Sequence, residues 1–174
     1  MPHEQTQTME PNSQSNVVNV QINVYADDDS GADSGVKFSH EWKFQDAPGQ
    51  YNKGRVDLPA NDSYTLKFHF QDRSSRNLSF ACPGANAMWV TNGTSSNPPT
   101  CPTAAGDGGQ IQYSGSGTNC SPNLLSVVDA NSGPECLLQY ALRFNGNAYT
   151  GPSGQQYPPY AYDPEIKNGG GATM

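Results

Sequence analysis

A short acidic loop contains the residues best suited to bind a metal ion. The loop runs DDDSGAD, with carboxylates at its first, third and seventh positions: Asp27, Asp29 and Asp33. Calcium prefers about six to eight oxygen ligands, and loops with alternating aspartates supply them. The loop has neither the glycine nor the closing glutamate that an EF-hand places at fixed positions. It therefore predicts either a weak calcium site or a solvated turn.

Four cysteines are widely spread and form no closely spaced pair: Cys82, Cys101, Cys120 and Cys136. Zinc sites usually contain at least one close pair of ligands, so this spacing argues against metal binding by the thiols. Two disulfides are one alternative, because they would cross-link the Gly-, Pro- and Ser-rich segment 82–136. Buried free thiols, as expected in a reducing compartment, are the other.

No pattern marks a catalytic centre. The histidines His3, His40 and His69 do not bracket a cysteine, which argues against the copper sites of β-sandwich electron carriers. The chain has no Gly-x-Ser-x-Gly turn for a nucleophilic serine, and no pair of carboxylates is marked for glycoside hydrolysis. An enzyme of unrecognised type is therefore the alternative with the least support.

The segment 149–164 is the most unusual apolar stretch of the chain. It carries four tyrosines among its prolines: Tyr149, Tyr157, Tyr160 and Tyr162. Tyrosine offers a large amphipathic contact area, and proline stiffens the backbone. The segment predicts a contact with another protein or a second copy, or a shallow carbohydrate platform to which Trp42 and Trp89 would contribute. Alternatively, it packs back over the domain and covers an edge strand.

The elements that must position these residues are short strands. Apolar and polar residues alternate with a period of two, which predicts half-buried strands. The strongest cases are 18–24, 36–44, 64–70 and 136–144. Weaker strands are expected at 78–82, 87–90, 111–113 and 124–128. About six to eight such strands, with turns between them and no helical periodicity, predict an all-β protein, an antiparallel immunoglobulin-like β-sandwich.

The length of 174 residues fits a single domain. Only 34% of the residues are apolar, and the 18 glycines and 14 prolines favour short elements joined by turns. We expect a polar flexible N-terminal segment over 1–16, the sandwich over 17–166 and a Gly-rich tail over 167–174.

The net charge of −7 argues against nucleic acids and anionic membranes as partners. No apolar stretch is long enough to span a bilayer. The N-terminal residues lack the basic and apolar regions of a secretory signal, which predicts a cytoplasmic protein, or a secreted one if disulfides are present.

Three stretches resemble the DP-EP family of small bacterial proteins. They are 17–28, 56–70 and the ending 162–168, which contains Asp163-Pro164-Glu165. The run 140–144 and the aromatic approach to Asp163 are also similar to the AidA/PixA inclusion-body proteins. The resemblance implies a compact β-sandwich without an enzymatic mechanism and, for PixA-like relatives, accumulation in intracellular inclusions. The segment 82–136 departs from both groups.

These observations predict a non-catalytic structural or self-associating interaction protein, which forms homo-oligomers or binds another protein through edge strands or tyrosines. The alternative is a ligand-binding module for carbohydrate or calcium. No cofactor other than that calcium ion is expected.

Overall fold

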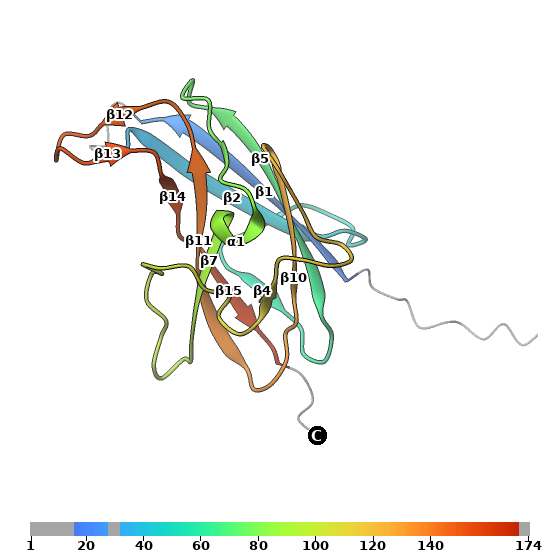
Figure 1. Cartoon of the computed structure of the whole chain (residues 1–174). Coiled ribbons are helices and arrows are strands. Elements are labelled where there is room, and N and C mark those ends of the chain that lie inside the picture. Colours follow the sequence, from blue (N-terminus) through green and yellow to red (C-terminus); the bar gives the residue numbers. More distant parts are fainter. Residues whose placement is uncertain (1–15, 28–31, 171–174) are drawn as a thin grey trace, which may run out of the picture.

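The computed structural model describes residues 16–27 and 32–170 of the chain. Within them the chain forms fifteen strands and one helical turn, α1 (Gly84–Ala87) (Figure 1). The prediction of an all-β protein is therefore confirmed. None of the described residues forms a helix long and apolar enough to cross a membrane.

A seven-stranded sheet, here called the first sheet, forms one layer. Its order is β3-β2-β1-β5-β10-β8, and β9 also pairs with β10. Its strands are β1 (Val17–Ala26), β2 (Val36–Phe44), β3 (Asn52–Lys53), β5 (Tyr64–Arg73), β8 (Ile111–Gln112), β9 (Asn119–Ser121) and β10 (Leu124–Asp129).

A six-stranded sheet, the second sheet, forms the other layer. Its order is β14-β11-β15-β4, with β6 and β7 pairing along the remaining side of β11. Its strands are β4 (Val56–Leu58), β6 (Ser79–Phe80), β7 (Met88–Gly93), β11 (Cys136–Asn145), β14 (Tyr160–Tyr162) and β15 (Glu165–Asn168). A small hairpin of β12 (Tyr149–Thr150) and β13 (Gln156–Tyr157) lies at one end of the molecule (Figure 1).

Both sheets are mixed, which corrects the expectation of purely antiparallel pairing. β1 pairs in parallel with β5, so that Val20 lies opposite Phe68, and β15 pairs in parallel with β4, so that Ile166 lies opposite Val56. Parallel neighbours need a long connection rather than a hairpin. Between β1 and β5 the chain forms β2 and β3 in the first sheet and then crosses to form β4 in the second.

The apolar residues of the alternating strands meet between the two sheets. Every second residue of β1 is fully buried: Val18, Val20, Ile22 and Val24. Rings from opposite sheets pack directly, with centroids 5.7 Å apart for Phe68 and Tyr140 and 4.4 Å apart for Phe70 and Phe144. The predicted inward faces therefore form one shared core.

The chain continues in the second sheet to Asn168, because Lys167 and Asn168 pair with Asp57 and Leu58. Strand structure thus extends two residues past the boundary that the sequence suggested at 166. The N-terminal segment before residue 16 and residues 171–174 lie outside the described part of the chain.

Candidate functional site

A loop crosses the outer face of the second sheet. Thr91, which points outward from β7, donates a hydrogen bond to the backbone oxygen of Thr100. A Cβ atom on Gly93 would lie 2.5 Å from the backbone nitrogen of Pro99, so the loop rests directly on this strand. Ala141 of β11, which lies opposite Trp89 of β7, also points outward, yet it is only 3% exposed. This face of the molecule is therefore largely covered.

The outer face of the first sheet presents polar side chains. Its outward residues in the three longest strands are Val17, Asn19, Gln21, Asn23 and Tyr25 in β1, Lys37, Ser39, Glu41 and Lys43 in β2, and Thr65, Lys67, His69, Gln71 and Arg73 in β5. Five of them are exposed: Tyr25, Lys37, Ser39, Gln71 and Arg73. We call this surface the polar sheet face.

Strand register arranges the polar sheet face in rows across β2, β1 and β5. The four rows are Lys43–Asn19–Lys67, Glu41–Gln21–His69, Ser39–Asn23–Gln71 and Lys37–Tyr25–Arg73. Neighbouring strands lie about 4.8 Å apart, and outward positions repeat about every 6.7 Å along a strand. The register therefore produces a regular grid in which carboxamides and hydroxyls lie between charged side chains.

His69 is held in place on this face by a side chain of the adjacent strand. Its Nε2 lies 2.8 Å from Oδ1 of Asn19, and because a carboxamide oxygen only accepts, Nε2 carries the hydrogen. Burial, and secondarily the charge of Lys67, lowers the pKa of His69. The imidazole is therefore neutral at neutral pH, and its Nδ1 is a hydrogen-bond acceptor.

A hollow of about 390 Å³ lies at the β3 side of the polar sheet face. It is lined by Asn23, Tyr25, Ser39, His40, Glu41 and Lys53. These groups combine neutral donors and acceptors with one carboxylate and one ammonium group. Tyr25 is 43% exposed and is one of the two large apolar side chains most exposed in the described part of the chain. Such a lining suits a ligand that carries many hydroxyl groups.

The four tyrosines of segment 149–164 pack back against the molecule. Tyr160 is fully buried, and its hydroxyl donates to the Asn147 oxygen at 2.8 Å. Tyr162 stacks on Phe38 with ring centroids 5.2 Å apart and shares a hydrogen bond with Nδ1 of His40. The structure thus shows the alternative in which this segment folds back over the sheets.

The other two tyrosines lie in the β12–β13 hairpin and contact residues outside it. The Arg76 guanidinium lies 3.8 Å from the ring centroid of Tyr149, and the hydroxyl of Tyr157 donates to Asp33. Both rings are half-buried. They serve to hold the hairpin against the rest of the protein.

Neither tryptophan lies on the polar sheet face. Trp42 points inward from β2, is 7% exposed and packs edge-on against Phe44. Trp89 is half-buried on the other side of the molecule, where the Arg143 guanidinium lies 3.7 Å from its ring centroid. Both rings are therefore already in contact with other side chains.

Asp33 uses both of its carboxylate oxygens within the protein. The Ser153 backbone nitrogen donates to Oδ1 at 2.8 Å, and the Tyr157 hydroxyl donates to Oδ2 at 3.0 Å. The hydrogen bonds with Ser153 lower the pKa of this carboxyl group. Asp27 binds Gly35 through its backbone nitrogen, and Asp29 lies outside the described residues. Within the described ranges, no cluster of three or more histidine, cysteine or acidic side chains could hold a metal ion.

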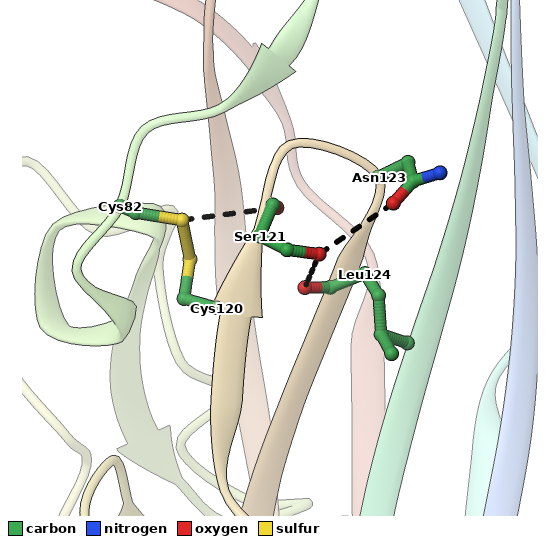
Figure 2. Close-up of a disulfide and its surroundings, with 5 residues drawn as sticks. All are labelled: Cys82, Cys120, Ser121, Asn123 and Leu124. Carbon is green, nitrogen blue, oxygen red and sulfur yellow. Dashed lines mark hydrogen bonds between the residues drawn. A yellow bond between two sulfur atoms is a disulfide. The ribbon is translucent and has the colours of Figure 1, made fainter.

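One pair of cysteines forms a disulfide, between Cys82 and Cys120 (Figure 2). It joins the residue two positions before α1 to β9, next to the turn that carries Ser121 and Asn123 (Figure 2). Cys101 is exposed, and desolvation together with Asp163 raises its pKa to about 11. Cys136 is buried in β11, and burial raises the pKa of its thiol. The structure therefore matches neither alternative in full: one disulfide forms where two were considered, and of the two free thiols only that of Cys136 is buried.

The sequence did not identify the polar sheet face as a site, because it predicted only that 18–24, 36–44 and 64–70 are half-buried strands. A signal was nevertheless present in the residue types of β1, because Asn19, Gln21 and Asn23 form an unbroken run of carboxamides at alternating positions.

No model of a known protein family matches the chain, and no curated protein sequence matches it.

Proposed function

We propose that this protein is a non-catalytic binding module that takes a carbohydrate on the polar sheet face. One observation carries the proposal: the loop over residues 94–107 crosses the second sheet, whereas the first sheet presents a grid of carboxamide, hydroxyl and charged groups. Sugar hydroxyls both donate and accept hydrogen bonds, and carboxamides offer donors and acceptors at one position. The hollow beside Asn23 and Tyr25 is a shallow depression in which part of such a ligand would bind.

The chemistry of the face favours binding over hydrolysis. Among the outward residues of β1, β2 and β5, Glu41 is the one carboxylate. Glycoside hydrolysis usually requires two carboxyl groups on either side of the scissile bond. Glu41 is therefore proposed as a hydrogen-bond acceptor for a hydroxyl group.

The proposal is tested by screening an array of neutral and acidic glycans against the wild type and two variants. In the first variant, Gln21→Ala and Asn23→Ala remove two neighbouring carboxamides from the face. In the control variant, Gln155→Ala removes an exposed carboxamide from the β12–β13 connection. We expect binding by the wild type and the control and a loss of at least about tenfold in the first variant, as for two lost hydrogen bonds. Absence of binding across the array would overturn the proposal.

Self-association is a second candidate function, favoured by the edge of β2. On the side of β2 that faces away from β1, Glu41 and Trp42 pair with β3. No described strand pairs with residues 36–40 of β2 on that side. An unpaired strand edge can add a strand from another copy. Sedimentation at increasing protein concentration tests this candidate, which predicts a rise in mass; a constant monomer mass contradicts it.

The family, the fold type and the cellular location are further proposals. The Asp163-Pro164-Glu165 turn supports membership of the DP-EP family, and in the structure it joins β14 to β15. The two packed sheets support an immunoglobulin-like sandwich that has acquired two parallel strand pairs. The disulfide supports an oxidising compartment over the cytoplasm, because disulfides are rare where glutathione and thioredoxin keep thiols reduced.

A further inference from the structure

The basic residues of this acidic protein are concentrated on the polar sheet face. The chain has nine Lys and Arg against sixteen Asp and Glu. Five of the nine lie at outward positions of the first sheet: Lys37, Lys43, Lys53, Lys67 and Arg73. The outward residues of β1, β2, β3 and β5 include one carboxylate, that of Glu41. The face is therefore positive although the whole chain has a net charge of −7.

The basic residues on this face have fewer close side-chain partners than the other basic residues of the chain. The four Lys and Arg elsewhere each contact a partner side chain: Arg55 with Asp57 at 2.8 Å, Lys167 with Glu135 at 3.3 Å, Arg76 with Tyr149, and Arg143 with Trp89. None of the five on the face forms an ion pair with a carboxylate among residues 16–27 and 32–170. Lys43 donates to the Gly49 oxygen and lies 5.9 Å from the ring centroid of Tyr51, and Arg73 donates to Oε1 of Gln71. All of these partners are uncharged.

Unpaired like charges on one face repel one another, and an anion that binds between them removes this cost. We propose that the ligand of the polar sheet face is an anionic glycan, a polysaccharide that carries carboxylate or sulfate groups. This inference rests on the proposed carbohydrate-binding function and specifies the charge of the ligand.

The positions of the cations match separated anionic groups. Lys43 and Lys67 flank Asn19 in one row, and Lys37 and Arg73 flank Tyr25 in another. Within a row the two cations are two strand spacings apart, about 10 Å, and the rows lie about 20 Å apart along β1. The rows between them contain mainly neutral groups, such as Asn23 and Gln71. A chain of sugars that alternates charged with hydroxyl-bearing groups fits this pattern.

A nucleic acid fits the same pattern less well. Its phosphates follow one another every few ångströms and call for a continuous basic track. Single strands also rely on several aromatic side chains on which bases stack, whereas Tyr25 is the one aromatic residue among the outward positions of β1, β2 and β5.

The experiment compares matched ligands that differ in charge. The probes are an oligosaccharide in which uronic acids alternate with neutral sugars and its methyl ester, a sulfated oligosaccharide and its unsulfated form, a single-stranded oligonucleotide and a poly-aspartate peptide. We expect both acidic glycans to bind at least about tenfold more tightly than their neutral forms, with an affinity that falls as salt increases, because salt screens exposed charges.

A matched pair of variants locates the effect. Lys43→Gln with Lys67→Gln removes two charges from the face, and Arg55→Gln with Lys167→Gln removes two charges elsewhere. The first variant should lose about tenfold or more in affinity for the acidic glycans and clearly less for the neutral forms, and the second should behave like the wild type.

The possible outcomes separate this inference from the proposed function. If neutral and acidic forms bind equally and the Lys43/Lys67 variant is normal, the anionic ligand is excluded while carbohydrate binding stands. Tighter binding of the oligonucleotide or the peptide than of either acidic glycan also overturns the inference. If no glycan of any charge binds, the proposed function itself fails.

Discussion

Asn168, near the end of the last strand, donates a hydrogen bond from Nδ2 to Oδ1 of Asp129 at 2.8 Å, and both side chains are fully buried. Oδ2 of Asp129 and Oδ1 of Asn168 have no hydrogen-bond partner among the described residues. When the carboxyl group of Asp129 is ionised, these two oxygens can only accept hydrogen bonds, so neither can satisfy the other. A proton on Oδ2 would make the buried carboxyl group neutral and remove the cost of burying its charge.

The stability of the protein should therefore fall as Asp129 ionises. Burial raises the pKa of Asp129 from 3.8 to about 6, despite the hydrogen bonds from Asn131 and Asn168 that lower it. Since the folded state holds this proton more tightly than the unfolded state, the stabilisation is complete below the unfolded pKa and is lost as the pH rises through the folded pKa. Between about pH 4 and about pH 8 this group should cost about 2 kcal/mol of unfolding free energy.

The variant Asp129→Asn isolates this effect from the other titrating groups. An asparagine keeps the acceptor for Asn168 and supplies a neutral donor in place of the protonated oxygen. Urea unfolding across this pH range should show a difference between the wild type and the variant that grows with pH. Parallel pH profiles for the two proteins would show that Asp129 does not titrate in this range. Cys136 is the nearby titrating group to monitor, because the charge of Asp129 contributes to raising its pKa.

Removal of the disulfide should lower stability substantially. Cys82 and Cys120 are 38 residues apart, and closing a loop of this length stabilises a fold by about 4 kcal/mol through the unfolded state. The double variant Cys82→Ser with Cys120→Ser should therefore have a clearly lower melting temperature than the wild type. Cys101→Ser is the matched control, because this exposed thiol is free. Equal melting temperatures for wild type and double variant would contradict the assigned pairing.

Two buried tyrosines should respond oppositely to loss of their hydroxyl groups. The Tyr140 hydroxyl is buried without a hydrogen-bond partner in the described part of the chain, so Tyr140→Phe should leave stability unchanged or raise it by up to about 1 kcal/mol. The Tyr160 hydroxyl donates to Asn147, so Tyr160→Phe should lower stability by about 1 kcal/mol. Chemical denaturation of both variants measures the difference. A larger loss for Tyr140→Phe than for Tyr160→Phe would contradict the structure.

The strands could be predicted from the sequence because the alternation of side chains is a local property. Val18, Val20, Ile22 and Val24 face the core as the period of two requires, and Cys136 lies on the buried face of the strand predicted at 136–144. The pairing of strands is not local. Nothing in the residues of β1 or β5 distinguishes a parallel neighbour from an antiparallel one, so the mixed sheets could not be foreseen.

The candidate site was hidden for the same reason. Lys43, Asn19 and Lys67 come from three strands and form a row only after two independent registers are fixed. Read one strand at a time, each is an ordinary solvated position. The tyrosines of segment 149–164 were visible in the sequence, but the direction of a ring depends on contacts such as Tyr162 with Phe38, which join distant parts of the chain.

Asp33 should act as an anchor for the β12–β13 hairpin. Asp33→Ala removes the acceptors for the Ser153 nitrogen and the Tyr157 hydroxyl, the two hydrogen bonds through which Asp33 holds the hairpin. Hydrogen exchange should therefore accelerate at Ser153 and its neighbours, while the amides of β1 stay protected. Asp33→Asn is an informative second variant, because its Oδ1 still accepts from Ser153 whereas its Nδ2 cannot accept from Tyr157. It should show a smaller acceleration than Asp33→Ala.

The same hydrogen-exchange measurement with calcium and with a chelator tests the acidic loop. If Asp33 only holds the hairpin, the exchange rates are identical in both conditions. Calcium-dependent protection of 32–35 would instead show that the carboxylate of Asp33 binds the ion.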